Sequence, residues 1–342
     1  MQRVKLVDVA RAAGVHPGTA SRALSADTGG LVSPDTVRRV VRAAERLGYV
    51  PNTVARGLRT ARSFLVAMVV PDVTNPLFPP MVRGAEQVLS QAGFTLVLTD
   101  TDNDAGTERK QVQQLRARGT DGFLIATARW QDQLVEELAD GRVPAVLINR
   151  NTSSHRLPYV GGDERTGIAV AVDHLVSLGH RRIVHLAGPQ DTSTGRERAS
   201  AFRHALRTHG LPITRSQVRT CDSYTERAGA QATERLLASD VEFTALLAGN
   251  DLIALGALAV LAATGKRCPG DVSVVGFNDL PMVDKLTPSL TTVTLPLREM
   301  GALAARMLLT AIDTPERDGA VAQSLLGVEL AVRGSTGRLL RQ

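Results

Sequence analysis

Residues 3–24 read RVKLVDVARAAGVHPGTASRAL, which is the pattern of two short helices joined by a tight turn. One helical face repeats at i, i+3, i+4 and i+7 and consists of Leu6, Val9, Ala10 and Ala13. Gly14 suits a left-handed C-terminal cap, and Pro17 suits the first position of a second helix. A helix-turn-helix that inserts its second helix into the DNA major groove has this layout. On spacing alone, a helical hairpin without a role in DNA binding fits equally well.

A third helix is expected to follow, because two such short helices cannot bury a core by themselves. Ser33 suits an N-cap, Pro34 the first helical position and Gly48 the end of this third helix. Its apolar face consists of Val37, Val40, Val41, Ala44 and Leu47. The polar side of the second helix carries His16, Thr19, Ser21 and Arg22.

Positive charge is concentrated at the front of the chain. Residues 1–62 contain 11 Lys or Arg and 4 Asp or Glu, a net charge of +7, whereas the remaining 280 residues contain 29 and 30, a net charge of −1. Only 4 of the 40 basic residues are Lys, but a preference for Arg does not explain why acidic residues avoid this segment. A basic module on a neutral body is expected of a protein that binds DNA phosphates.

The overall composition indicates a globular protein of two or three domains, with 342 residues, 43% hydrophobic and 22% charged. Cys221 and Cys268 match no metal-binding spacing and are expected to be reduced thiols. The amphipathic N-terminus, which contains Asp8, does not resemble a signal peptide, and no apolar run approaches the ~18 residues of a membrane helix. We therefore expect a cytoplasmic protein without a membrane segment, metal or cofactor.

From Phe64 onward, short apolar runs alternate with helical patterns. The first half predicts strands at 64–70, 94–99, 122–126 and 144–148 and helices at 81–91, 107–118 and 131–140. The second half predicts helices at 167–178, 196–208, 226–238, 251–263 and 298–311 and strands at 183–187, 218–221, 245–248, 272–276 and 326–332. This alternation predicts two α/β halves with parallel sheets and a ligand cleft at the carboxyl ends of the strands.

Five polar residues come just after predicted strands: Asp72, Thr127, Asn149, Asn250 and Asn278. Any one of them could be an ordinary capping residue, since Asn and Asp are common where strands end. Because all five are expected at the same edge of the two sheets, together they predict a binding site for a small molecule.

Many short motifs occur in a characteristic order along the chain. They are VDVARAAGV (7–15), TASR (19–22), LGYVPN (47–52), VARGL (54–58), PDVTNPLF (71–78), HLVSLGHRRI (174–183), AGP (187–189), GND (249–251), VVGFND (274–279), PSLTT (288–292) and VRGS (332–335). With these motifs, the chain resembles the lactose-repressor family of bacterial transcription regulators over essentially its whole length.

The resemblance implies an N-terminal three-helix helix-turn-helix domain (1–50), a hinge helix (51–62) and a periplasmic-binding-protein-like core of two doubly wound α/β subdomains (63–342). It implies a homodimer bound to near-palindromic double-stranded operator DNA and controlled by a small-molecule effector, such as a sugar or another metabolite. The expected DNA-binding residues are His16, Pro17, Gly18, Thr19, Ser21, Arg22, Asn52, Ala55 and Leu58. Leu58 would be a wedge that partly unstacks a base step in the minor groove.

The start of the recognition helix departs from the family pattern. Relatives usually have Ser and two longer polar residues where this chain has His16, Pro17 and Gly18. Direct base reading is therefore expected to depend on Arg22, paired with a guanine, with His16 as a further candidate. Pro17 could contact a thymine methyl group.

The resemblance also implies an effector site, with ligand contacts at Asp72, Phe78, Thr127, Asn149, Arg198, Tyr224, Asn250 and Asn278. The two aromatic side chains would stack on an apolar face of the ligand, and Arg198 with the amides would bind hydroxyls or a carboxylate. Asn149 and Asn278 stand where many relatives have Asp. A cleft with fewer acids weakens the case for a neutral sugar and leaves a nucleoside or another metabolite open.

The sequence argues against two other classes of function. The sequence contains no GxGxxG after the first strand, no GxxxxGK, no HExxH and no GxSxG, and its seven histidines are scattered, so an enzyme is disfavoured. A solute-binding protein without a DNA role would not need the basic segment 1–62. The C-terminal residues 336–342 are too short for a heptad coiled coil, which favours a dimer over a tetramer. Whether the effector releases or promotes DNA binding stays open.

Overall fold

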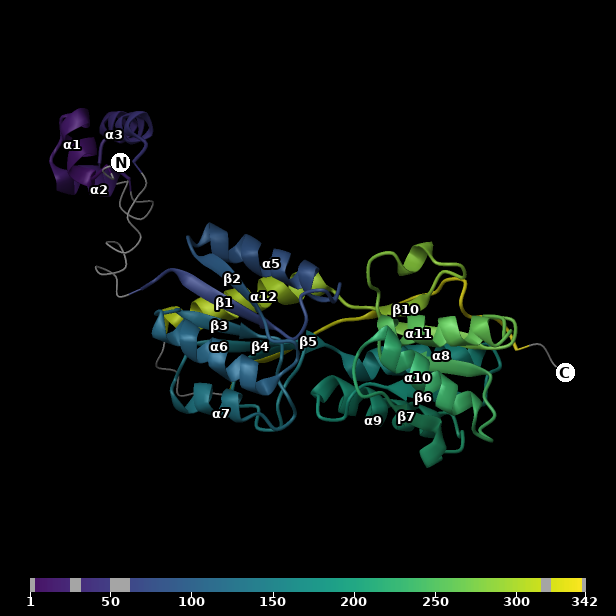
Figure 1. The fold of residues 1–342 in the computed structure, drawn as a ribbon. Helices are drawn as coiled ribbons and strands as arrows, with labels where there is room; N and C mark the ends of the chain where they lie inside the picture. Colours follow the sequence, from purple (N-terminus) through teal and green to yellow (C-terminus); the bar gives the residue numbers. More distant parts are fainter. Residues whose placement is uncertain (1–3, 25–31, 50–61, 315–320, 340–342) are drawn as a thin grey trace. The chain divides into compact units, whose positions relative to one another are not determined.

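The computed structural model describes residues 4–24, 32–49, 62–314 and 321–339 (Figure 1). Its contacts divide the chain into two units, residues 1–63 and residues 64–342. Some sequence-based predictions lie outside the described residues, namely the turn at 25–30, most of the hinge at 51–62 and the DNA contacts Asn52, Ala55 and Leu58.

The first unit contains the predicted helix-turn-helix. Its described helices are α1 (Leu6–Ala13), α2 (Pro17–Ala23) and α3 (Pro34–Leu47). Gly14 and Gly48 follow α1 and α3 in the left-handed conformation, with φ of 65° and 62°, which a residue with a Cβ adopts at a cost. The three helices pack around a small core of Val9, Ala10, Ala13, Ala20, Ala23, Val40, Ala43 and Ala44. The small side chains allow the short helices to approach closely.

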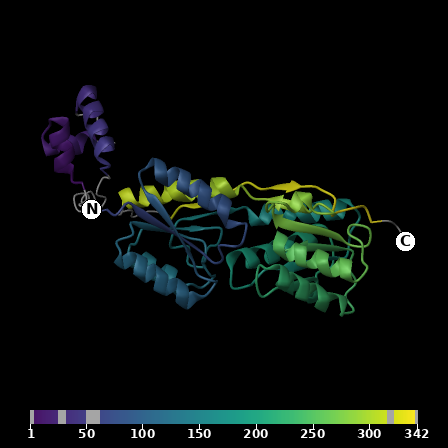
Figure 2. The ribbon, with the colours of Figure 1, turned by 45° about the horizontal axis from the view of Figure 1, so that its top comes forward.

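The first subdomain of the second unit is a six-stranded parallel sheet in the order β11-β5-β4-β3-β1-β2. Its strands are β1 (Leu65–Val70), β2 (Thr95–Asp100), β3 (Gly122–Ile125), β4 (Ala145–Ile148), β5 (Tyr159–Gly162) and β11 (Gln323–Leu326). Its helices are α5 (Phe78–Gln91), α6 (Ala105–Ala117), α7 (Gln133–Asp140) and α12 (Leu297–Asp313). Helices α5 and α12 cover one face, and α6 and α7 cover the other (Figure 2).

Alternation along β1 explains why the sheet is covered on both sides. Val66 and Met68 pack toward α5 and α12, whereas Ala67 and Val69 pack toward α6 and α7. All four side chains are fully buried. A continuous apolar run of this kind is typical of a strand in a parallel sheet.

Helices α5 and α12 come from distant parts of the sequence and lie side by side. A Cβ on Gly84 would meet the carbonyl oxygen of Arg298 at 2.0 Å, and a Cβ on Gly301 would meet that of Met81 at 1.9 Å. Both positions therefore require glycine, because any side chain would force the two helices apart.

The second subdomain contains another six-stranded sheet, in the order β12-β10-β9-β8-β6-β7, with β12 antiparallel to β10. Its strands are β6 (Ile183–Ala187), β7 (Val218–Thr220), β8 (Ala245–Ala248), β9 (Ser273–Asn278), β10 (Thr291–Thr294) and β12 (Glu329–Ala331). Its helices are α8 (Glu164–Ser177), α9 (Ser193–Thr208), α10 (Glu226–Leu237) and α11 (Asp251–Ala263), with short 3-10 turns η2 (Arg215–Gln217) and η3 (Val283–Lys285).

The predicted fold class is confirmed, but the chain does not form two consecutive halves. It leaves the first subdomain after β5 and returns for α12 and β11 before it ends in the second subdomain. The single closing strand predicted at 326–332 is wrong. Leu326 pairs with Gly162 in the first sheet, whereas Glu329 pairs with Thr294 in the second, so the segment serves both sheets as two strands. Strands β5 and β10 were not predicted.

Candidate functional site

A small cavity lies where the two subdomains of the second unit meet. In this conformation its volume is about 20 Å³, enough for roughly one water molecule. Side chains from both subdomains line it: Asn75, Leu77, Phe78, Asn149, Arg150, Thr194, Arg198, Tyr224, Asn250 and Asn278. Most of them follow the carboxyl ends of strands, where ligands bind in parallel sheets. Six were predicted from the sequence: Phe78, Asn149, Arg198, Tyr224, Asn250 and Asn278.

Two of the predicted effector residues do not line this cavity. The carboxylate of Asp72 accepts hydrogen bonds from the backbone N–H and the hydroxyl of Thr74, at 2.8 and 2.6 Å. The hydroxyl of Thr127 donates to the buried carboxylate of Glu108. Both side chains thus organise the loops in which they lie.

Four lining residues were missed by sequence reasoning. Arg150 directly follows Asn149. It would have been predicted if the polar residues considered after each strand had included one more position. Asn75 and Leu77 belong to a loop whose path only the tertiary structure defines. Thr194 lies in the first turn of α9, and nothing local in the sequence indicates that this turn faces the cavity.

Two asparagines turn the chain sharply at the cavity. Asn149 follows β4 with φ of 67°, and Asn278 ends β9 with φ of 114°. Non-glycine residues rarely adopt positive φ, and Asn is among those that tolerate it best. Such backbone strain is concentrated at functional sites, and here it brings two amide groups to the same cavity.

Arg198 is held in place by a buried ion pair. Its Nε and Nη2 donate to the carboxylate of Glu164 at 2.5 and 3.1 Å, and its Nη1 donates to the carbonyl oxygen of Gly249 at 2.5 Å. The guanidinium also stacks on Phe277, at 3.8 Å from the ring centroid. Burial opposes the charge, but the carboxylate of Glu164 outweighs it and raises the pKa of Arg198 above its ordinary value. The Arg198 guanidinium thus remains charged.

Arg150 lies in a different environment. It is 8% exposed, and its Nε has no hydrogen-bond partner among the described residues. Its guanidinium lies 5.8 Å from the centroid of the Tyr224 ring. Burial lowers the pKa of Arg150. The ordinary pKa of arginine lies so far above neutral pH that the side chain still keeps its charge. The Oδ1 of Asn278 is likewise buried without a partner in the described part of the chain.

Several contacts join the two subdomains beside the cavity. The backbone N–H of Trp130 donates to the carbonyl oxygen of Asp191 at 2.6 Å, and the guanidinium of Arg196 lies 5.1 Å from the Trp130 ring centroid. The backbone N–H of Asn151 donates to the Ser193 hydroxyl at 2.8 Å. These contacts hold the subdomains together in the observed conformation.

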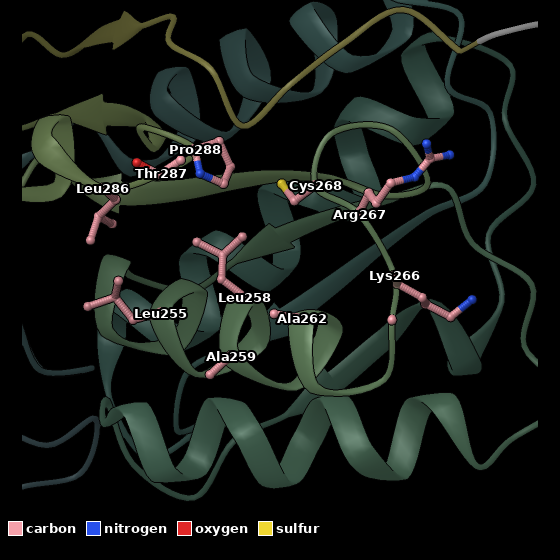
Figure 3. A pocket seen from close by; sticks show the side chains of 11 residues that line it. Leu255, Leu258, Ala259, Ala262, Lys266, Arg267, Cys268, Leu286, Thr287 and Pro288 are labelled. Carbon is pink, nitrogen blue, oxygen red and sulfur yellow. The ribbon is translucent and has the colours of Figure 1, made fainter.

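A second, larger hollow runs along the outer side of α11 (Figure 3). It has a volume of about 630 Å³. Leu255 and Leu258 are half-buried on this side, while Ile253 and Ala257 of the same helix face the core. The hollow is lined by Leu255, Leu258, Ala259, Ala262, Gly265, Lys266, Arg267, Cys268, Leu286, Thr287 and Pro288.

In the first unit, the predicted DNA-reading residues lie on α2 or at its start. His16 is the N-cap of α2, and its Nδ1 accepts a hydrogen bond from the Gly18 backbone N–H at 3.1 Å. Pro17 occupies the first helical position. Arg22 is exposed, and its Nε donates to the carbonyl oxygen of Gly18 at 3.3 Å. Thr19 and Ser21 are half-buried.

No group of three or more His, Cys, Asp or Glu side chains among the described residues is arranged to hold a metal ion. None of the helices that the structure describes has the length and apolar character needed to cross a membrane.

Two family models match the chain. Residues 5–52 match bacterial regulatory proteins of the lacI family. Residues 63–327 match the periplasmic binding proteins and sugar binding domain of the LacI family.

Individual relatives cover nearly the whole chain. The ribose operon repressor of Halalkalibacterium halodurans is 32% identical over 311 residues, which are 91% of each protein. The HTH-type transcriptional regulator CelR of Thermobifida fusca is 36% identical over 319 residues, 91% of this chain and 92% of that protein. The crystal structure of the lac repressor dimer bound to operator and the anti-inducer ONPF matches with a TM-score of 0.82 and 27% identity, over 98% of this chain and all of that one.

Proposed function

Because the chain belongs to the lacI family of bacterial regulatory proteins, we propose that residues 1–50 read an operator, residues 51–62 form a hinge, and residues 63–342 bind an effector and dimerise. The chain is a transcriptional regulator that binds near-palindromic double-stranded DNA as a homodimer and responds to a small-molecule effector. The observation that carries the assignment of the effector site is the cavity between the two subdomains. Catalysis has no part in this proposal, since the lining groups are those of a binding site.

We assign base reading to α2, with Arg22 as the main specificity residue. Its guanidinium can donate two parallel hydrogen bonds to a guanine in the major groove. His16 uses Nδ1 to cap α2, which leaves Nε2 as its donor toward DNA. Pro17, Gly18, Thr19 and Ser21 would contribute close packing and phosphate contacts.

An operator titration tests this assignment. Arg22→Ala is expected to weaken operator binding by about 1–3 kcal/mol and to relax specificity at one base position. Arg38→Ala is a matched control, since Arg38 is an exposed arginine of α3 that pairs with Asp35. The control variant should show a small loss of affinity that is the same for all DNA sequences. An equal loss on every sequence with Arg22→Ala would contradict its role in base reading.

The hinge proposal concerns Asn52, Ala55 and Leu58. A leucine wedge in the minor groove unstacks one base step and bends the duplex. Leu58→Ser is therefore expected to reduce both operator affinity and DNA bending, measured by energy transfer between the ends of a labelled duplex. Unchanged bending would remove Leu58 from this role.

We propose that the outer side of α11 is part of the dimer interface. A helix with apolar residues on both sides is normally buried, but Leu255 and Leu258 are only half-buried in the single chain. A second copy would cover the hollow shown in Figure 3. Leu258→Glu is expected to shift the protein toward monomer in sedimentation experiments, whereas Arg207→Glu, at an exposed position of α9 outside the hollow, should have little effect. A fully dimeric Leu258→Glu protein would exclude this surface.

Effector control follows from linkage between the two sites. An effector shifts the population of a cleft conformation only by its difference in affinity between conformations. Contacts such as Trp130 to Asp191 join the subdomains in one of these conformations. The cleft angle would set the spacing of the two hinges in the dimer, and hence their ability to pair on DNA.

The full-length protein offers a direct test of the whole proposal. A thermal-shift screen of metabolites identifies ligands, and operator binding is then measured with and without each hit. A dimer making about 6–10 phosphate contacts should lose roughly 10³–10⁵-fold in affinity between about 50 and 200 mM salt. Ligand binding without any preference for promoter DNA over scrambled duplex would instead indicate a solute-binding protein.

A further inference from the structure

Two polar groups at the cavity between the subdomains, one on a cation and one a hydrogen-bond acceptor, are left without a hydrogen-bond partner among the described residues. The Nε of Arg150 and the Oδ1 of Asn278 are both buried without a hydrogen-bond partner among the described residues. Their residues are 8% and 3% exposed, and both line the cavity. Leaving such groups without a hydrogen bond destabilises the folded protein, and the cost is larger for a charged group. A ligand that supplies both partners would therefore gain affinity from the two groups.

The charges around the cavity do not balance Arg150. None of the ten described residues that line the cavity is an Asp or Glu. Glu164 is already bound to Arg198, and Asp191 lies 3.8 Å from the Nε of Arg129. Glu108 accepts from Thr127, and burial raises the pKa of its carboxyl to about 7, so it is only partly charged at neutral pH. The described groups around the cavity thus balance the charge of Arg150 only in part.

Helix ends add to this positive potential. Three lining residues lie at or just before the first turn of a helix: Thr194 on α9, Tyr224 before α10 and Asn250 before α11. Phe78 is the first residue of α5. The N-terminal end of a helix carries a partial positive charge, which favours an anion nearby. Four such ends around one cavity reinforce the charge of Arg150.

We propose that the effector is an anionic, hydroxyl-bearing small molecule of the sugar-acid or sugar-phosphate type, whose anionic oxygen accepts from Arg150 and whose hydroxyl donates to Asn278. This inference rests on the proposed function of the cavity as the effector site and names its ligand class. Phe78 and Tyr224 lie beside these groups and would contact the carbon skeleton. Because the cavity holds only about one water, the cleft must open or its side chains must move to admit such a ligand.

The test uses the full-length protein and probes that share one carbon skeleton. D-gluconate carries a carboxylate, D-glucose 6-phosphate carries a phosphate, D-glucose is neutral, and inorganic phosphate tests the ion alone. We expect at least one of the two anionic sugars to raise the melting temperature and to bind in calorimetry, with D-glucose binding at least tenfold more weakly. The carboxylate and phosphate probes distinguish the two sources of the anion.

Two variants and one control test the roles of Arg150 and Asn278. Arg150→Met should weaken binding of the anionic sugar about 10–150-fold, the effect of losing a charged hydrogen bond. Arg165→Met, which removes an exposed arginine from α8, should leave it unchanged. Asn278→Asp keeps the shape and the acceptor but adds a negative charge, so it should weaken the anionic sugar and spare or improve D-glucose. A merely structural role for Asn278 would not change the preference between charged and neutral sugars.

The inference is overturned if neither anionic sugar binds, if D-glucose binds as well as the anionic sugars do, or if Arg150→Met leaves anion affinity unchanged. Stabilisation by inorganic phosphate alone would also overturn it, since no sugar skeleton would then be recognised. Operator binding by the same preparation separates this failure from failure of the proposed function. A salt-dependent preference for promoter DNA would keep the regulator assignment even if no anionic sugar bound.

Discussion

Each of the two subdomains contributes one buried arginine to the cavity, and the two arginines differ in their hydrogen bonding. On the second subdomain, Arg198 is bound to Glu164 and to the carbonyl oxygen of Gly249. On the first subdomain, Arg150 follows β4, and its Nε has no hydrogen-bond partner among the described residues. A buried charge is tolerated when it is paired and is costly when it is not. The difference indicates that Arg198 has a structural role and forms part of the framework of the site, whereas Arg150 is available to bind the ligand.

The largest effect is expected from breaking the paired arginine. Arg198→Met leaves the Glu164 carboxylate buried without its cation, so the free energy of unfolding should fall by about 3–5 kcal/mol. Urea denaturation without ligand measures this loss. Replacing both partners, in Arg198→Met with Glu164→Leu, should recover part of the stability. A loss below about 1 kcal/mol for the single variant would show that the ion pair is not part of the framework.

A smaller effect concerns Glu108, a buried acid that forms no ion pair like that of Glu164 within the described part of the chain. Burial raises the pKa of Glu108 to about 7 in the folded protein, from 4.5. The folded state therefore holds this proton at higher pH than the unfolded state does, and stability should fall as pH rises from about 4.5 to about 7. Glu108→Gln removes this contribution, on the order of 3 kcal/mol over the window.

Urea denaturation of wild type and Glu108→Gln at several pH values measures the difference. The comparison cancels contributions from other groups, such as Asp251, whose pKa burial also raises to about 7. Parallel pH profiles for the two proteins would mean that Glu108 is charged in the folded state, and Arg150 would then have an acid to balance it.

For Arg150, the expected change in stability is small and of either sign. Arg150→Met removes a buried charge without orphaning an acid, so the free energy of unfolding should change by less than about 1 kcal/mol or increase. The same urea series provides the measurement. A loss of about 3 kcal/mol or more would place Arg150 in the framework with Arg198 and remove the contrast between the two arginines.

The smallest expected effect comes from the contacts that join the two subdomains. Arg196 lies over the Trp130 ring at an exposed edge, where a cation–π contact is worth about 0.5–1 kcal/mol. Trp130→Ala should thus leave global stability nearly unchanged while it shifts the cleft toward open conformations. Small-angle scattering and effector affinity report this shift. Arg196→Gln should reproduce it, and opposite effects of the two variants would exclude a shared contact.

The accuracy of sequence-based prediction differed between the two units. The first unit follows from local signals, since the caps Gly14 and Ser33, Pro17 at the first position of α2 and the apolar spacing all lie within short stretches. The strands and helices of the core were also predicted to within a few residues, apart from β5, β10 and the split closing strand. Those three depend on pairing with distant partners, such as Leu326 with Gly162, which no local pattern contains.

For the cavity, strand ends and the family resemblance indicated the right region and six of its lining residues. Asp72 and Thr127 were expected there too, but their side chains bond to Thr74 and Glu108 in their own subdomain. Strand-end position fixes where a residue lies along the chain, while the direction of its side chain depends on the loop and its neighbours. Arg150 shows the same limit, because only the placed side chains reveal that its Nε has no hydrogen-bond partner among the described residues.

The amino-acid sequence by itself determined the class of the protein: a basic helix-turn-helix unit, two parallel α/β sheets, and the order of family motifs. These depend on periodicity, capping and charge, which act over a few residues. Only the tertiary structure decided that α12 and β11 belong to the first sheet, and which of the two buried arginines is paired with a carboxylate. Pairing of strands and charges depends on distances between residues far apart in the chain, and only the folded molecule sets those distances.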